Sequence, residues 1–233
     1  MTDPANSLYE TSKYSDLTVT LADGEVLKLH KNIVCKSDFF RAACDGGFRV
    51  STPSVTCESP QTDTTPQRAK ASHINFPQDP AKAMKILIMH LYGYKGEEVT
   101  FRIVKMDRLP VNLCFDVYDV AIKYFVLKLA EHMEASFESW IKRTVGRMCD
   151  VERVRAEDVD DLCWVTRRLD EVQYGESRLR EALLQALQSH MTKMLKKGAL
   201  ARFVRERLLS CTNLALDLLK SGGLDGRGLE LES

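Results

Sequence analysis

Residues 14–48 read YSDLTVTLADGEVLKLHKNIVCKSDFFRAACDGGF, and they carry more structural information than any other part of the chain. Leucine and valine alternate with threonine over residues 17–21, which is the periodicity of a β-strand. Asp23-Gly24 then supplies a hairpin turn, because these residue types tolerate the positive φ that such turns need. The alternation resumes at Leu27 and Leu29. The segment therefore predicts a β-hairpin.

Two short helices, over residues 31–36 and 37–44, are predicted directly after this hairpin. Ser37 is a suitable N-cap for the second helix, and Gly46-Gly47 ends it. Further along, residues 73–76 predict a return to the sheet. A helix is expected to begin with Asp79 as its N-cap and Pro80 at the first helical position, where proline is favoured, and to end at Gly93.

Helical periodicity dominates the second half of the chain. One predicted helix opens at Pro110, and the others span about 129–143, 156–169, 176–196 and 200–220; a short edge strand is expected over 99–103. Strands are thus confined to the first half. This distribution predicts an α+β domain followed by helices.

Three segments are expected to be poorly ordered. They are the polar N-terminus (1–13), a polar loop rich in Pro, Ser, Thr and Gln (49–72) and a Gly-rich tail (221–233). Such segments bury too little apolar surface to offset the entropy lost on ordering. We therefore expect a flexible N-terminus, a mobile loop and a flexible tail.

Composition argues against several broad classes of function. The 33 basic and 33 acidic side chains cancel, which argues against an electrostatic nucleic-acid binder. No apolar run reaches the ~20 residues that cross a bilayer, so no membrane partner is expected. The first residues lack a secretory signal pattern, and the seven cysteines are odd in number and widely spaced. We expect an intracellular protein of the cytoplasm, the nucleus or both, with reduced thiols.

A basic segment, 193–207, is the strongest sequence argument for nucleic-acid binding. Its charges could contact phosphates, or they could complement the acidic segment 150–161. We favour a solvated or internally complemented face over nucleic-acid binding, because a run of like charges usually forms such a face.

Four landmarks follow one another along residues 14–142. They are Ser15-Asp16 before the first strand, His30-Lys31 and Ser37-Asp38-Phe39-Phe40 after the hairpin, Asp79-Pro80 through Leu91-Tyr92, and Ala121-Ile122-Lys123-Tyr124. In this order and spacing they resemble the BTB/POZ family, and in particular the BTB proteins found in fungi. The resemblance implies a BTB/POZ-like domain, a small β-sheet flanked by helices, over residues 14–142. Residues 150–220 resemble the helical extension that follows BTB in many members.

The implied function is that of a non-catalytic protein–protein interaction module, acting as an adaptor or an oligomerising scaffold. Protein partners are expected, and a homodimer is one expected assembly. A substrate adaptor of a cullin-type ubiquitin ligase is an alternative, and a transcription-associated regulator is another. Val50 weakens the cullin alternative, because cullin-binding members usually have glutamate at this place. The family also often has Pro or Gly after the Ala-x-x-Tyr helix, whereas Leu127-Lys128 offers no break here.

By the same resemblance, the candidate interaction residues are Asp16, Lys31, Phe39, Phe40 and Phe48. Asp16 and Lys31 would form a partly buried ion pair near an interface. The alternative, which we favour, is a fold-stabilising contact within one chain, because such contacts are common. The three phenylalanines could equally be core residues, and the sequence does not separate the two uses.

No catalytic, cofactor-binding or metal-binding residue is predicted. His30 has no nearby His or Cys at metal-ligand spacing, so a hydrogen-bonded structural role is favoured. No nucleophile elbow, phosphate-binding glycine loop or metalloprotease motif occurs in the sequence. We therefore expect no enzymatic activity.

Three Ser/Thr-Pro steps lie in the polar loop, at Thr52, Ser59 and Thr65. We hypothesise that they are proline-directed phosphorylation sites, where added charge controls a partner. Such dipeptides are common by chance, so an inert loop is the alternative. Phosphopeptide mass spectrometry that finds all three unmodified in cells would remove the hypothesis.

Overall fold

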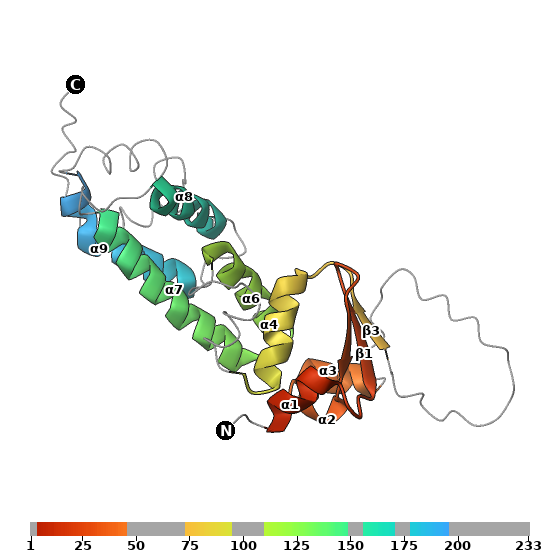
Figure 1. The fold of residues 1–233 in the computed structure, drawn as a ribbon. Coiled ribbons are helices and arrows are strands. Elements are labelled where there is room, and N and C mark those ends of the chain that lie inside the picture. Colours follow the sequence, from red (N-terminus) through yellow and green to blue (C-terminus); the bar gives the residue numbers. More distant parts are fainter. Residues whose placement is uncertain (1–3, 46–72, 95–109, 149–155, 171–177, 196–233) are drawn as a thin grey trace, which may run out of the picture. The chain divides into compact units, whose positions relative to one another are not determined.

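The computed structural model describes residues 4–45, 73–94, 110–148, 156–170 and 178–195. The chain divides into two compact units, Met1–Met133 and Glu134–Ser233. A three-stranded sheet and several helices make up the described part of the first unit, and the described part of the second is helical (Figure 1). The predicted α+β class is confirmed.

The sheet of the first unit has the order β2-β1-β3. Strand β1 (Leu17–Leu21) pairs antiparallel with β2 (Val26–Leu29) and parallel with β3 (His73–Phe76). Every second residue of β1 is buried, as the alternation in the sequence predicts. The apolar face of β1 therefore lies on the core.

The turn between β1 and β2 has the predicted hairpin chemistry. Gly24 has φ +82° and donates its N–H to the carbonyl of Leu21 at 3.0 Å. The Asp23 carboxylate accepts the N–H of Glu25 at 3.0 Å. Glycine adopts this positive φ without steric cost. The hairpin is confirmed.

Two short helices follow, as predicted: α2 (Lys31–Val34) and α3 (Asp38–Cys44). Ser37 occupies the N-cap position of α3, but its hydroxyl makes no cap hydrogen bond. The hydroxyl instead donates to the backbone carbonyl of Tyr124 at 2.8 Å. Ser37 thus joins α3 to a distant segment of the same unit.

The N-terminus corrects one expectation. Residues 1–13 were expected to be flexible from their polar composition, yet helix α1 spans Pro4–Thr11. The Tyr9 ring packs edge-on against the rings of Tyr92 and Tyr94, with centroids 5.1 and 5.9 Å apart. A single aromatic side chain can dock a short helix even where composition is polar.

Helix α4 (Ala81–Leu91) ends as its sequence predicts. Gly93 has φ +90°, and its N–H donates to the carbonyl of His90 at 2.9 Å. The N–H of Tyr94 donates to the carbonyl of Met89 at 3.1 Å. These two bonds form a Schellman motif, in which glycine takes the left-handed position.

Helix α6 (Val111–Lys123) ends in the same motif without glycine. The N–H of Val126 donates to the carbonyl of Ala121 at 2.8 Å, and that of Phe125 donates to Ile122 at 3.2 Å. Phe125 occupies the left-handed position, with φ +56°. The chain therefore does break after the Ala-x-x-Tyr helix, which the absence of Pro and Gly had argued against.

Helix α7 spans Leu127–Met148 and is longer at both ends than the predicted 129–143. The boundary between the two units, Met133/Glu134, falls within it. The predicted domain limits, 142 and 150, therefore do not coincide with this boundary. A continuous helix gives no local sign in the sequence of where one core stops and another begins.

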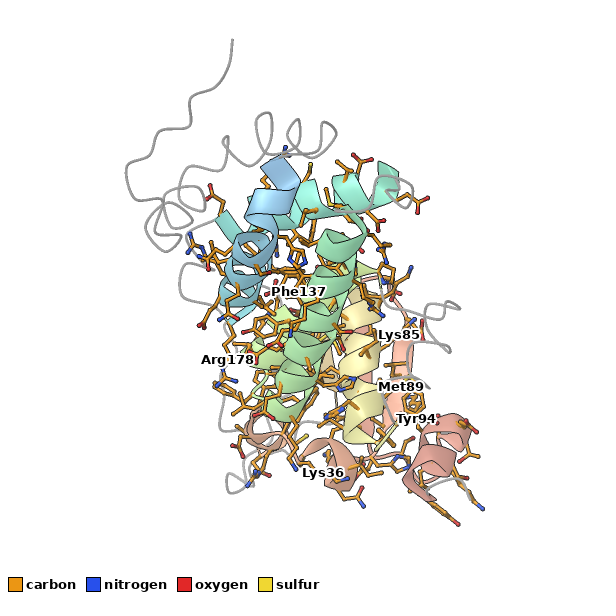
Figure 2. All side chains as sticks on the ribbon, turned by 90° about the vertical axis from the view of Figure 1, so that its left-hand side faces the viewer. Lys36, Lys85, Met89, Tyr94, Phe137 and Arg178 are labelled. Carbon is orange, nitrogen blue, oxygen red and sulfur yellow. The ribbon has the colours of Figure 1, made fainter. Side chains whose placement is uncertain are left out.

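The second unit contains α8 (Ala156–Asp170) and α9 (Arg178–Leu195), close to the predicted helices 156–169 and 176–196. The Arg147 guanidinium pairs with the buried Asp158 carboxylate, and Arg178 pairs with Glu134 at 3.4 Å. Phe137, on α7, and Arg178, at the start of α9, are labelled in Figure 2. The apolar core of this unit includes Phe137, Ile141, Val145, Leu162, Val165, Leu169, Leu183 and Leu187.

Several expectations lie outside the described residues. They are the loop 49–72 with Thr52, Ser59 and Thr65, the residues Phe48 and Val50, the strand 99–103, the helix 200–220 and the tail 221–233. Within the part of the chain that is described, no helix is long and apolar enough to cross a membrane.

Candidate functional site

His30 is fully hydrogen-bonded within the first unit. Its backbone N–H donates to the Tyr92 hydroxyl at 2.9 Å, and its Nε2 lies 2.6 Å from the carbonyl of Lys13. Because a carbonyl only accepts, Nε2 carries the proton, and Nδ1 accepts from the Tyr92 hydroxyl at 2.8 Å. His30 thus ties the end of α1 to the end of α4, and neither ring nitrogen is available to a ligand.

Tyr92 is the buried partner in this arrangement. Burial raises the pKa of its phenol to about 12, so the hydroxyl stays protonated near neutral pH. The hydroxyl can therefore accept from the His30 backbone and donate to its ring at once. Among the described residues, no group of three or more His, Cys, Asp or Glu side chains is placed to hold a metal ion.

Asp16 and Lys31 are brought together, but not as an ion pair. The Asp16 carboxylate accepts the backbone N–H of Lys31 at 2.8 Å. This N–H is one of the unpaired donors at the start of α2. Within the described residues, no Asp16–Lys31 salt bridge occurs. The observed contact is a helix cap within one chain.

Asp79 bonds to the C-terminal end of α6 and so links two of the predicted landmarks, its own and Ala121-Ile122-Lys123-Tyr124. Its buried carboxylate accepts from the Tyr124 hydroxyl at 2.5 Å and from the Lys123 ammonium at 2.6 Å. Burial, followed by the hydrogen bond to Asp79 and then the charge of that carboxylate, raises the pKa of Tyr124. Asp79 was expected to cap α4, but Pro80 holds the cap position and the carboxylate points to α6 instead.

The predicted aromatic residues of α3 contribute to the core. Phe40 is 0% exposed, and its ring centroid is 5.9 Å from that of Phe76. Phe39 is half-buried and packs edge-on against Tyr124, with centroids 4.5 Å apart. The core use of Phe40, left open by the sequence, is the one observed, while Phe48 lies outside the described residues.

An exposed apolar surface lies where α6 turns into α7, and we name it the Phe125 corner. It consists of Ile122, Phe125 and Leu127, which are 44%, 64% and 59% exposed. Clustered exposed apolar side chains of this kind mark interaction sites more often than scattered single ones do. Sequence reasoning missed this site, because helical periodicity predicts Phe125 on the buried face of the helix that opens at Pro110, and that prediction is wrong.

The exposed Phe125 also has a left-handed backbone conformation, which is a second reason to consider it a functional residue. The left-handed region costs about 1–2 kcal/mol for a residue with a Cβ. Hydrogen bonds of the neighbouring Tyr124 with Ser37 and Asp79 stabilise this turn. Strain that the surrounding structure maintains is concentrated at functional sites.

The charged residues within the corner's own sequence are all basic. Residues 122–128 read IKYFVLK, with Lys123 and Lys128 exposed and no acidic residue between them. The Lys123 ammonium is shared with Asp79. The chemistry that fits this surface is an apolar pocket with acidic groups at its edge.

A Ser-His contact on α9 could suggest nucleophilic catalysis. Ser189 Oγ lies 2.8 Å from His190 Nδ1. Both atoms also contact the carbonyl of Ala186, at 2.9 and 3.0 Å. Nδ1 is therefore satisfied by the helix backbone, and this local pattern does not make the imidazole a base for the hydroxyl.

No protein-family model matches this chain, and no curated protein matches it.

Proposed function

We propose that this chain is a non-catalytic protein–protein interaction module of the BTB/POZ type, acting as an adaptor or an oligomerising scaffold. The support for the type comes from contacts among landmarks chosen from sequence alone. Asp16 caps Lys31, and Ser37 and Asp79 both bind Tyr124. Such mutual hydrogen bonds are expected of residues that stabilise a common family fold.

The observation that carries the binding proposal is the Phe125 corner. A large aromatic side chain is held in solvent at a strained backbone position, beside two further exposed apolar residues. Aromatic anchors of this kind provide most of the binding energy in many interfaces. The partner we propose is a protein with an apolar pocket for Phe125 and acidic groups that face Lys123 and Lys128.

The test uses Phe125→Gly in the full chain, expressed with an affinity tag in its cells of origin. Glycine removes the ring and relieves the positive φ, so the variant is expected to fold. Tyr14→Gly is the matched control, because Tyr14 is also aromatic, is 80% exposed and has φ +63°. We expect Phe125→Gly to lose at least one stoichiometric partner, identified by mass spectrometry, that wild type and Tyr14→Gly retain.

Full retention of partners by Phe125→Gly would contradict the proposed site. A wild-type chain that is monomeric by light scattering and retrieves no protein at all would contradict the interaction function itself. A stoichiometric cullin among the partners would favour the ligase-adaptor alternative over the scaffold.

A further inference from the structure

Helix α8 exposes a row of acidic side chains that ends in a tryptophan, and we name it the Trp164 stripe. Its members are Glu157, Asp160, Asp161 and Trp164, and all four are exposed. Spacings of three, four and seven residues place them on one side of the helix. Trp164 is 39% exposed. An exposed aromatic side chain among these charges favours a contact surface, because aromatic residues are enriched in protein interfaces.

The carboxylates of the stripe have no basic partner within the part of the chain that is described. Asp158, on the buried side of α8, pairs with Arg147, but none of the salt bridges among the described residues includes a member of the stripe. Burial, and then the charges of three neighbouring carboxylates, raises the pKa of Asp161. A cationic partner would relieve this repulsion.

The Phe125 corner has the opposite chemistry. It exposes an aromatic ring beside two aliphatic side chains, and its charged residues, Lys123 and Lys128, are basic and exposed. The chain as a whole has no net charge, so two copies do not repel each other at long range. Every copy therefore carries both members of a complementary pair of surfaces.

We propose that the Phe125 corner of one copy of this chain binds the Trp164 stripe of a second copy. In this contact the Phe125 ring packs on the Trp164 indole, and the two lysines of the corner face the carboxylates of the stripe. Aromatic pairs and complementary charges are both favourable in interfaces. The inference rests on the proposed function, because it takes the corner as a binding surface and names its partner.

The contact is heterologous, since the two surfaces differ. A copy whose corner is occupied still offers its stripe to another copy, and contacts of this kind either close into rings or extend into chains. The protein would then act as an oligomerising scaffold without a second kind of protein.

The experiment measures self-association of the purified full chain by sedimentation velocity over a range of protein and NaCl concentrations. We expect the average mass to rise with protein concentration and to fall as NaCl is added, because exposed charges are screened by salt. Phe125→Gly and Asp160→Lys should each weaken the association by about tenfold or more, since one removes the aromatic anchor and the other reverses a charge in the contact.

Two matched variants make the same kinds of change elsewhere. Tyr14→Gly removes another exposed aromatic side chain at a positive φ, and Glu181→Lys reverses another exposed charge in the second unit, on α9. Both should associate as wild type does.

A mixture of the two weakened variants tests the pairing itself. Phe125→Gly keeps an intact stripe, and Asp160→Lys keeps an intact corner. An equimolar mixture should therefore form a one-to-one complex with about the affinity of the wild-type contact. A mixture that associates no better than either variant alone would show that the corner does not bind the stripe.

The inference is also overturned if wild type is monomeric at about 100 μM, or if either substitution leaves self-association unchanged. A monomeric wild type whose cellular partner is lost in Phe125→Gly would remove this inference and leave the proposed function standing. If Phe125→Gly keeps both self-association and every cellular partner, both are contradicted.

Discussion

At the scale of single residues, two buried tyrosine hydroxyls hold separate parts of the first unit together. Tyr92 bonds to the backbone and ring of His30, and Tyr124 bonds to Asp79. Each hydroxyl bonds to a buried polar atom, Nδ1 of His30 in the first case and Oδ2 of Asp79 in the second. The phenol oxygen therefore matters beyond the packing of the ring.

Tyr124→Phe is expected to lower the free energy of unfolding by about 1–3 kcal/mol, because the buried Asp79 carboxylate loses a donor. Urea denaturation followed by circular dichroism measures the change. Tyr14→Phe is the control, since Tyr14 is exposed, and it should stay within about 0.5 kcal/mol of wild type. An equal effect of the two substitutions would show that the Tyr124 hydroxyl contributes nothing specific.

The same hydroxyl predicts how stability depends on alkaline pH. The pKa of Tyr124 is raised in the folded state, so the folded chain binds more protons than the unfolded chain above the ordinary tyrosine pKa. Its contribution to stability is therefore complete below about pH 10 and is lost as the pH rises beyond that. Unfolding free energies from about pH 8 to 11 should fall less steeply for Tyr124→Phe than for wild type. Parallel curves would rule out this linkage.

At the scale of elements, the start of α2 is capped by the side chain of Asp16, the residue just before β1. Asp16→Ala should destabilise the chain by about 0.5–2 kcal/mol, because the Lys31 N–H loses its cap. Lys31→Met should change stability by less than about 0.5 kcal/mol, since the Lys31 ammonium is not paired with Asp16. Comparable losses for both variants, measured by urea unfolding, would restore the ion-pair interpretation.

The two Schellman ends show what could be read from sequence at this scale. The end of α4 was predicted, since Gly93 adopts a left-handed conformation readily and signals it by residue type. The end of α6 was not, since phenylalanine gives no such signal. Phe125 takes this conformation because the Val126 N–H bonds to the carbonyl of Ala121. Hydrogen bonds of Tyr124 with Ser37 and Asp79 fix the preceding residue. The candidate site was missed for the same reason.

At the scale of the whole molecule, each unit has its own apolar core. Phe40→Ala should destabilise by about 3–5 kcal/mol and Leu183→Ala by about 2–5 kcal/mol, because both side chains are fully buried. Hydrogen exchange of the full chain should speed up within Met1–Met133 for the first variant, and within Glu134–Ser233 for the second. Equal acceleration of both units by either variant would show instead that the chain unfolds as one cooperative body.

The sequence by itself determined the α+β class, the hairpin at Asp23-Gly24, the two short helices after it and the end of α4 at Gly93. These features depend on side-chain periodicity and on the backbone preferences of neighbouring residues. A short stretch of sequence contains all of that information. Only the tertiary structure decided that α1 docks through Tyr9, that Asp79 and Ser37 turn towards Tyr124, that Phe125 stands in solvent and that a unit boundary falls inside α7. These features depend on residues far apart in the chain, whose contacts outweigh local preferences once the core has formed.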